Sequence, residues 1–409
     1  MAARGSAGSL TDSIGIGVLT RLVDRDLVDE VLAETGRREK RSRLLPARVV
    51  VYYVMALCLF FDDAYEEVMR KLVNGLQALG GWRREWHVPT TGAISQARAR
   101  LGAEPLRVLF ERVAAPMASA STPGAFCAGY RLMAIDGVLL ETPDTTANAA
   151  AYGRAGNDHG PGAFPKIQVL GLAECGTHAV VAATLAPGRS SERANAEALF
   201  THLAPDMLLM ADRGFYSYDL WKSARGTGAE LLWRVRADLT LPVHERLPDG
   251  SYRSTLVPKS VRADLKRGHA RRTEHVEIPV RVIEYQVIDR PGLEVIRLIT
   301  SIADHDLTPA AELAAVYHDR WEIELLFDEI ETHQMSGATI LRSKSPDLIE
   351  QEIWALLLTH YAIRHLMTEA AESIAEDPDR LSFTRSLRVI RRQVTNQAGF
   401  SPLPHEESD

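Results

Sequence analysis

The stretch Leu132-Met133-Ala134-Ile135-Asp136-Gly137-Val138-Leu139-Leu140 decides which class of fold the chain can adopt. It is apolar along its whole length except at Asp136 and Gly137. A near-continuous apolar run of this length is typical of a central strand that is buried on both faces, as in sheets covered by helices. The stretch therefore predicts an α/β sheet that carries one carboxylate inside a central strand.

Further strands and helices follow this stretch in a definite order. Apolar runs and helical spacing predict strands over 167–172, 178–185, 207–211 and 230–235, with helices over 192–203 and 216–225. Three strands, a helix, a strand, a helix and a strand form the order of a ribonuclease-H-like sheet. The expected fold class is therefore α/β, with a ribonuclease-H-like mixed-sheet core.

The parts of the chain outside this core have different patterns. Residues 1–122 show helical spacing, including an apolar run over 47–61, and predict an all-α N-terminal domain. Residues 237–300 alternate short β-like pieces with turns that contain Gly and Pro, and they predict a β-rich insertion. The core would then consist of 126–236 and 301–375, followed by a C-terminal segment over 376–409.

The composition excludes several classes of protein. The 409 residues are 46% hydrophobic and 25% charged, a balance found in globular chains. Three widely spaced cysteines fit neither a disulfide framework nor a thiolate zinc site. The longest apolar run, from Val49 to Phe61, is too short to span a membrane, and the N-terminus has no apolar leader. We therefore expect a cytoplasmic protein with no membrane partner.

One segment of the N-terminal domain has the pattern of a DNA recognition helix. It runs from Thr90 to a closing glycine at Gly102, with a good helix N-cap at its start. Gln96, Arg98 and Arg100 would face DNA from such a helix. An exposed polar helix without a DNA contact is an equal alternative. The net charge of −7 does not decide between them, because the acidic excess lies in 301–409 and residues 1–100 are mildly basic.

Three acidic residues are candidates for a metal site. Asp136 lies inside an apolar strand, where a carboxylate needs a cation, several hydrogen bonds or a metal ion. Asp212 ends a second buried strand, and open α/β sheets bind their ligands at such strand ends. Glu324 lies in a long helix predicted over 308–333. If the three carboxylates converge, they suit hard divalent cations, and two such ions promote in-line phosphoryl displacement.

The spacing of this helix supports the same site. Tyr317, Arg320 and Glu324 are spaced i, i+3 and i+7 and share one stripe of the helix. Arg320 could grip a phosphate with its guanidinium, and Tyr317 could hydrogen-bond another. Taken singly, each feature has a structural alternative: a solvated helix face, a helix N-cap at Asp212, a paired core carboxylate at Asp136. The order strand, strand end, helix favours the site.

These residues resemble those of bacterial insertion-sequence transposases of the DDE class, in the insertion-sequence-four group that is marked by a Tyr-Arg-Glu-Lys signature. The similar stretches are Ile135-Asp136-Gly137, Ala211-Asp212-Arg213-Gly214-Phe215-Tyr216 and Tyr317-His318-Asp319-Arg320-Trp321-Glu322-Ile323-Glu324. Parts of the N-terminal region are also similar, so the resemblance covers nearly the whole chain. The signature helix is its most specific element.

The resemblance implies a DNA transposase with an N-terminal domain that binds the ends of an insertion sequence. Asp136, Asp212 and Glu324 would be both catalytic residues and ligands of two Mg²⁺ ions, with Mn²⁺ able to substitute. Tyr317, Arg320 and Arg213 would contact DNA. The partners implied are double-stranded DNA, as terminal inverted repeats and as target, and a second copy of the chain in a homodimer on DNA at the bacterial nucleoid.

The sequence departs from the signature at one position. The pattern Tyr-x2-Arg-x3-Glu-x6-Lys ends on Glu331, which replaces a phosphate-binding lysine by the opposite charge. The segment after Arg391-Arg392 also lacks the basic tail that the resemblance implies. Two alternatives follow: a catalytically impaired or repurposed relative that binds DNA ends without transposing, and a nuclease that cuts but does not join.

Overall fold

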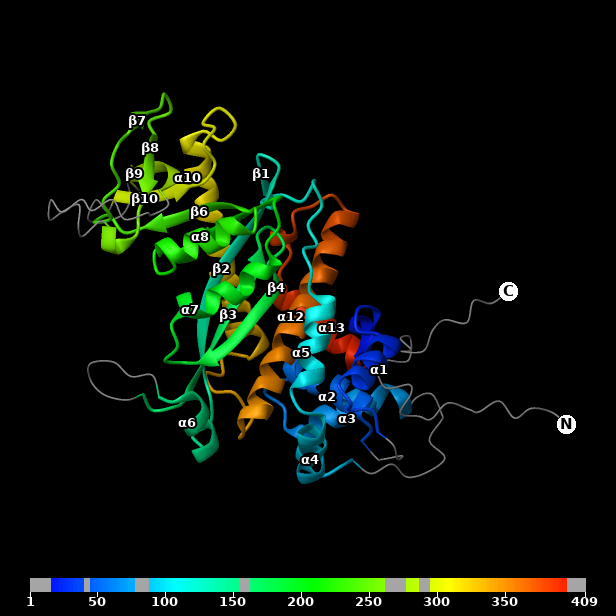
Figure 1. The fold of residues 1–409 in the computed structure, drawn as a ribbon. Coiled ribbons are helices and arrows are strands. Elements are labelled where there is room, and N and C mark those ends of the chain that lie inside the picture. Colours follow the sequence, from blue (N-terminus) through cyan, green and yellow to red (C-terminus); the bar gives the residue numbers. More distant parts are fainter. Residues whose placement is uncertain are drawn as a thin grey trace. The chain divides into compact units, whose positions relative to one another are not determined.

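The computed structural model describes residues 16–39, 45–77, 88–154, 162–261, 277–286 and 295–395. Its contacts divide the chain into two compact units, whose elements are labelled in Figure 1. We call them the helical unit, Met1–Ala115, Leu140–Ile167 and Phe327–Asp409, and the sheet unit, Pro116–Leu139 and Gln168–Leu326. Each unit is described separately below.

The helical unit is built around two apolar helices, α2 and α12. Every residue of α2 except Arg48 is buried, and α12 packs against both α2 and α5. The described helices are η2 Gly17–Arg21, α1 Arg25–Glu34, α2 Ala47–Leu59, α3 Tyr65–Gln77, α4 Thr91–Leu101, α5 Glu104–Val113, α6 Thr146–Tyr152, α12 Pro346–Ser373, η5 Pro378–Arg380 and α13 Phe383–Thr395. The prediction of helices in the N-terminal region is therefore confirmed. Over the described ranges, no helix combines the length and apolar character that crossing a membrane would require.

The sheet unit contains a ten-stranded mixed sheet. Its order is β4-β3-β2-β5-β6-β10-β9-β8-β7, and β1 pairs with β2 outside this path. The strands are β1 Phe126–Cys127, β2 Tyr130–Glu141, β3 Lys166–Glu174, β4 Ala179–Pro187, β5 Met207–Ala211, β6 Glu230–Val235, β7 Glu245–Arg246, β8 Tyr252–Leu256, β9 Ile278–Gln286 and β10 Val295–Thr300. β2 is parallel to β5, and β5 is parallel to β6.

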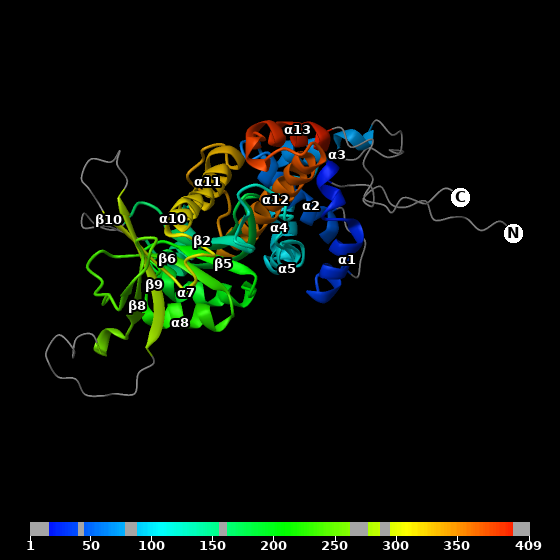
Figure 2. The same cartoon turned by 90° about the horizontal axis from the view of Figure 1, so that it is seen from above.

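Helices cover this sheet, as the buried strand pattern requires. They are α7 Glu192–Ala196, η3 Glu197–His202, α8 Tyr218–Gly226, α10 Ala310–Asp319 and α11 Trp321–Asp328. In Figure 2, α7 and α8 lie on one side of β5 and β6, and α10 lies on the other. All five residues of β5 are buried. The predicted strands and helices follow one another in the predicted order, with the helix α6 as an unpredicted addition between β2 and β3. The α/β, ribonuclease-H-like fold class is confirmed.

The strands of the region predicted as a β-rich insertion, 237–300, continue the same sheet. Its last strand, β10, pairs antiparallel with β6, so β10, β9, β8 and β7 extend the core sheet beyond β6. Residues 262–276 and 287–294 of this region lie outside the described residues, as do 396–409 of the predicted C-terminal segment. Residues 301–375, expected as one part of the core, divide between the two units within α11.

The helix predicted over 308–333 is interrupted twice. α10 ends at Asp319 and α11 begins at Trp321, with i→i+3 hydrogen bonds on both sides of Arg320. After Asp328 the chain forms a π-helical segment, η4 Glu329–Gln334. A π-helical turn is wider than an α-helical one, so the regular spacing that would align Glu331 with Glu324 does not continue through it.

Candidate catalytic site

The register of two parallel strands brings Asp136 and Asp212 to the same level of the sheet. Ile135 of β2 and Ala211 of β5 are direct partners, and each is followed by one of the two aspartates. The Asp136 carboxylate accepts a hydrogen bond of 2.8 Å from the Gly137 N–H. Side chains at equivalent positions of neighbouring parallel strands are close neighbours. The two acids that are far apart in sequence are therefore adjacent in the fold.

Arg320 joins the third acid to this pair. Its Nη1 lies 3.2 Å from Asp136 Oδ2, and its Nη2 lies 2.9 Å from Glu324 Oε1. Arg320 is 5% exposed, and its Nε–H has no hydrogen-bond partner among the described residues. The interruption of the helix at Arg320 places this residue between α10 and α11. One buried guanidinium thus connects two of the three predicted catalytic residues.

Tyr317 acts on the same site from α10. Its side chain is buried, and its hydroxyl donates a 3.4 Å hydrogen bond to the Ala211 carbonyl, at the end of β5 next to Asp212. The guanidinium of Arg320 lies 5.8 Å from the centre of the Tyr317 ring. In this arrangement Tyr317 connects α10 to the strand end that carries Asp212, and its hydroxyl is bound to the protein backbone.

The electrostatics show that the three acids share one environment. Burial raises the pKa of Asp136 above its ordinary value. The Gly137 N–H and Arg320 lower that pKa, whereas the charges of Glu324 and Asp212 raise it further. Burial is the largest of these influences, and the like charges of Glu324 and Asp212 add to it. A cation bound beside Asp136 would offset this repulsion between the carboxylates.

The carboxylate oxygens of Asp136, Asp212 and Glu324 are not all close enough together to bind one metal ion. Among the described residues, the ligand atoms of Asp136, Asp212 and Glu324 do not all lie within 4.8 Å of one another. The guanidinium of Arg320 contacts two of these carboxylates. Arg320 and the strand register link the three acids, and their assignment as joint ligands of metal ions stays a prediction.

A fourth carboxylate, Glu192, lies at this site and was missed by the sequence reasoning. Its Oε1 is 3.0 Å from the point that a Cβ atom on Gly137 would occupy. Burial raises the pKa of Glu192, and the charges of Asp136 and Asp212 raise it further. The available signal was the glycine after Asp136, which leaves room for a neighbouring group where a larger residue would fill it.

The predicted recognition helix is present as α4, but one of its three candidates points inward. Thr90 caps the helix, Gly102 ends it with a φ of 73°, and Gln96 and Arg100 are exposed. Arg98 is 1% exposed, which contradicts its assignment to DNA contact. Its guanidinium donates to Gln351 Oε1 at 2.9 Å, to the Tyr65 hydroxyl at 2.8 Å and to Ser343 Oγ at 2.9 Å. This network holds helices of the helical unit together.

Comparison with known proteins assigns a family to this arrangement. Residues 13–111 match the model of the insertion element 4 transposase N-terminal region, and residues 128–361 match the transposase DDE domain. The second match covers more than half of the chain and includes Asp136, Asp212 and Glu324. The chain belongs to the IS4 group of DDE transposases.

Two proteins illustrate how far the similarity of this transposase extends. The chain is 30% identical over 383 residues to the transposase InsG for insertion sequence element IS4 of Escherichia coli (strain K12), covering 93% of this chain and 83% of InsG. Among solved structures, the cryo-EM structure of the piggyBac transposase synaptic complex with hairpin DNA aligns with 97% of this chain and 83% of that chain, at 11% identity and a TM-score of 0.46.

Proposed function

We propose that this transposase binds the ends of an insertion sequence and that Asp136, Asp212 and Glu324 carry out strand cleavage and strand transfer with divalent metal ions. The observation that carries this proposal is the register of β2 and β5 together with the Arg320 contacts, which join the three acids of the DDE domain. DNA cleavage and joining in this family require a divalent metal, and we propose Mg²⁺, two ions per site, with Mn²⁺ able to substitute.

The donor chemistry of the site fits such ions. Carboxylate oxygens are the ligands that Mg²⁺ and Mn²⁺ prefer, and Asp136, Asp212 and Glu324 supply them, with Glu192 beside them. Burial raises the pKa of Asp136, the charges of Glu324 and Asp212 add to this rise, and bound cations would offset the repulsion among the three carboxylates. Bound ions would supply Lewis-acid activation of the nucleophile and stabilise the charge that develops on the leaving oxygen.

Arg320 has two roles in this proposal. Without DNA, its guanidinium holds Asp136 and Glu324 in place and lowers their mutual repulsion. When DNA binds, a backbone phosphate can replace the carboxylates as the acceptor of the Arg320 hydrogen bonds, because the planar guanidinium donors match two phosphate oxygens. Tyr317 positions the end of β5 through the Ala211 carbonyl, and a contact from its hydroxyl to a phosphate would require that hydrogen bond to open.

The helical unit would recognise the DNA ends through Gln96 and Arg100, which are exposed on α4. In the sheet unit, Arg213 is exposed next to Asp212 and would contact DNA there. We propose that the partners are double-stranded terminal inverted repeats and target DNA, bound by a homodimer in the cytoplasm at the nucleoid. The predicted division into a helical DNA-binding part and a catalytic part with a β-rich insertion belongs to the same proposal.

One observation favours a second candidate, a catalytically impaired relative that binds ends without cutting them. Glu331 stands where the signature has lysine, and burial, with Asp328 adding to it, raises the pKa of its carboxyl. Glu331→Lys separates the two candidates. An intact enzyme changes its cleavage rate by less than about tenfold, whereas a large gain in cleavage identifies the native glutamate as a defect.

A cleavage assay on DNA that carries the terminal repeats tests the proposed function. Asp136→Asn, Asp212→Asn and Glu324→Gln should each lower Mg²⁺-dependent nicking by about a thousandfold or more, because a lost ligand removes several kcal/mol of transition-state stabilisation. End binding should stay within about twofold of wild type. Asp144→Asn, a substitution at a carboxylate paired with Arg154 outside the site, is the control. Normal nicking by any of the three variants contradicts the assignment of that residue.

A further inference from the structure

The first turn of α11 determines where Glu324 lies. Arg320 separates α11 from α10, and on both sides of it the backbone forms i→i+3 hydrogen bonds, from the Arg320 N–H to the Tyr317 carbonyl and from the Ile323 N–H to the Arg320 carbonyl, each 3.3 Å long. The first N–H groups of a helix have no partners within it. Because α11 starts anew after the interruption, its orientation depends on the contacts that its first turn makes with the rest of the sheet unit.

Glu322 makes such a contact from this first turn. Its carboxylate accepts a hydrogen bond from the Gly176 N–H, in the turn that joins β3 to β4. The same carboxylate lies 3.8 Å from Nε2 of the buried His178. Helix residues two positions apart point about 200° apart, so Glu322 and Glu324 lie on different sides of α11. Glu322 therefore binds the protein while Glu324 faces the catalytic site.

The turn between β3 and β4 holds its N–H donor in a defined place. Gly176 has a φ of 80°, and a Cβ atom there would lie 2.6 Å from the Pro123 carbonyl oxygen, so the turn packs closely against a neighbouring segment. The Cys175 N–H donates a 3.0 Å hydrogen bond to the Leu132 carbonyl of β2. β2 is the strand that carries the first aspartate of the site. The contact from this turn thus fixes α11 relative to that strand.

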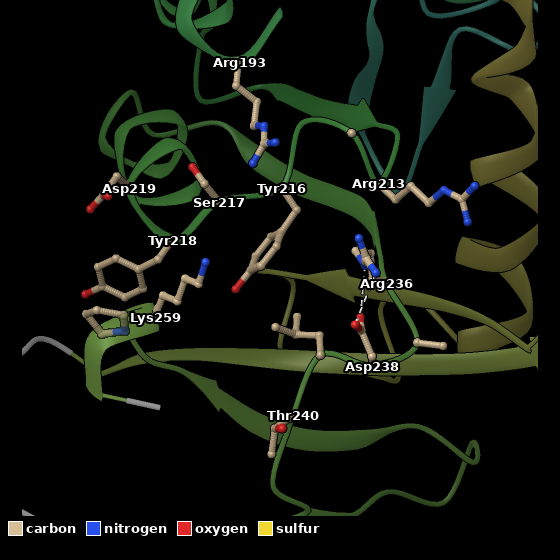
Figure 3. A pocket seen from close by; sticks show the side chains of 14 residues that line it. Arg193, Arg213, Tyr216, Ser217, Tyr218, Asp219, Arg236, Asp238, Thr240 and Lys259 are labelled. Atoms are coloured by element: carbon tan, nitrogen blue, oxygen red, sulfur yellow. Dashed lines mark hydrogen bonds and ion pairs between the residues drawn. The ribbon is translucent and has the colours of Figure 1, made fainter. Parts of the chain in front are cut away.

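The contact of Glu322 is separate from the cavity of about 1240 Å³ in the sheet unit. Figure 3 shows the lining of this cavity, which comes from α7, the chain from the end of β5 into α8, and the chain after β6 and β8. Neither Glu322 nor the turn between β3 and β4 is among its lining residues. The hydrogen bond between them is therefore internal to the protein and is not part of a ligand pocket.

We propose that Glu322 is a positioning residue for Glu324. The hydrogen bond from Gly176 holds the first turn of α11 against the end of β3, and this keeps Glu324 where it meets Arg320 and, through Arg320, Asp136. The contact needs an acceptor oxygen at the end of a side chain of this length and does not need a negative charge. This inference rests on the proposed function, in which Glu324 is a metal ligand.

Three substitutions of Glu322 separate the length of the side chain from its charge in a Mg²⁺-dependent nicking assay. Glu322→Gln keeps the length and the acceptor, so its kcat should stay within about twofold of wild type. Glu322→Met keeps the length but has only a weak acceptor, and its kcat should fall about ten- to a hundredfold, since a misplacement of about 1 Å can cost that much. Glu322→Asp keeps the charge but is one methylene too short, and its kcat should fall about fivefold or more.

The binding of DNA and a matched carboxylate serve as controls in this assay. KM for the end DNA should stay within about twofold of wild type in all variants, because Glu322 contacts the protein and not the DNA. Glu312→Met removes an exposed carboxylate of α10 that accepts a hydrogen bond of 3.5 Å from the Cys127 thiol, and it should nick like wild type. A rise in KM with unchanged kcat would contradict the positioning role.

Hydrogen exchange of the backbone amides of α11 measures the anchoring without any need for cleavage. Glu322→Met and Glu322→Asp should raise this exchange about tenfold, whereas Glu322→Gln should leave it unchanged. The amides of α10 should exchange equally in all variants, and far-UV circular dichroism at the assay temperature shows which variants are folded. If Glu322→Gln behaves like Glu322→Met, or if Glu322→Asp behaves like wild type, the proposal is wrong.

The outcome is distinguishable from failure of the proposed function. If the wild type nicks its DNA ends and Glu322→Met nicks equally fast, only the role of Glu322 is wrong. If the wild type does not nick, but exchange in α11 rises in Glu322→Met and Glu322→Asp and not in Glu322→Gln, the anchoring of α11 by Glu322 holds and the proposed catalytic activity is wrong.

Discussion

Two buried arginines in the sheet unit, Arg281 and Arg320, each pair with an aspartate. The pKa values of these two aspartates are shifted in opposite directions. Arg281 is 1% exposed and Arg320 is 5% exposed, and each contacts at least one aspartate. Burial acts to raise the pKa of Asp249, the partner of Arg281, but hydrogen bonds from Ser251 and Ala310 and the charge of Arg281 outweigh it and lower the pKa to about 2. The pKa of Asp136, the partner of Arg320, is raised.

Burial and the number of partners together explain this difference, because burial prevails at Asp136 and is outweighed by hydrogen bonds and Arg281 at Asp249. Arg281 donates to Ser251 Oγ, to Asp249 and to the Thr308 carbonyl, and Asp249 in turn accepts from the Ala310 N–H at 2.9 Å. In the cluster around Arg281, the guanidinium and Asp249 form an ion pair, and the other guanidinium donors have oxygen acceptors of the protein. The cluster around Arg320 leaves the guanidinium Nε–H without a partner among the described residues and has more carboxylates than cations. We infer that the ion pair of Arg281 and Asp249 stabilises the fold, whereas the additional carboxylates near Arg320 are available to bind a cation.

The largest expected effect is a loss of stability when the cluster around Arg281 loses its carboxylate. Asp249→Ala should lower the free energy of unfolding of the sheet unit by about 3–5 kcal/mol, because it leaves a buried guanidinium without its carboxylate. Urea unfolding followed by circular dichroism measures this change. Glu245→Gln, which removes the carboxylate of an exposed pair with Arg253 in the same part of the sheet, is the matched control and should change stability by less than about 0.5 kcal/mol.

The same residue should make stability depend on pH. The folded-state pKa of Asp249 is about 2, below the value of about 3.9 expected in the unfolded chain. Its contribution is therefore fully present above about pH 4 and is lost as the pH falls toward 2. Unfolding curves of wild type and Asp249→Ala should converge over this interval. A constant difference between them down to pH 2 would show that the carboxylate charge plays no part.

A smaller effect is expected at the fourth carboxylate of the unbalanced cluster. Glu192→Gln removes one negative charge beside Asp136 and Asp212, so the dissociation constant for Mn²⁺ should rise about tenfold. Equilibrium titration with Mn²⁺ measures it without any need for cleavage. Glu197→Gln, in the helical segment that follows α7, should leave the constant unchanged. Equal constants for Glu192→Gln and wild type would exclude Glu192 from the metal environment.

The smallest effect is the stability change at the unbalanced cluster itself. Asp136→Asn should change the free energy of unfolding by less than about 1 kcal/mol, because Arg320 keeps its contact with the half-exposed Glu324 and because an ionised Asp136 is disfavoured by burial. The same urea experiment compares it with Asp249→Ala. A loss as large as that of Asp249→Ala would mean that both arginine clusters are structural.

Much of the site could be predicted from the sequence, because its residues stand in strong local patterns. Asp136 interrupts an apolar strand, Asp212 ends another, and the spacing of Tyr317, Arg320 and Glu324 marks one helix face. The strand order then places the first two side by side, as the pairing of Ile135 with Ala211 shows. These predictions needed only periodicity and the common rules of α/β sheets.

The predictions that failed depended on partners far away in sequence. Arg98 has the pattern of an exposed helix residue, but Gln351, 253 positions later, gives it a buried hydrogen-bond partner. Glu192 opens a short helix without any apolar period, and its place against Gly137 follows from tertiary packing alone. The interruption of the helix at Arg320 could not be predicted, because the apolar spacing continues on both sides of it. Local pattern does not encode such contacts.

Mn²⁺ binding to the full-length chain, followed by electron paramagnetic resonance, tests the central claim most directly. We expect the triple variant Asp136→Asn/Asp212→Asn/Glu324→Gln to lose at least about a hundredfold in affinity relative to wild type, while the far-UV circular dichroism spectrum stays the same. If the triple variant binds Mn²⁺ as tightly as the wild-type protein does, the three carboxylates do not form the metal site.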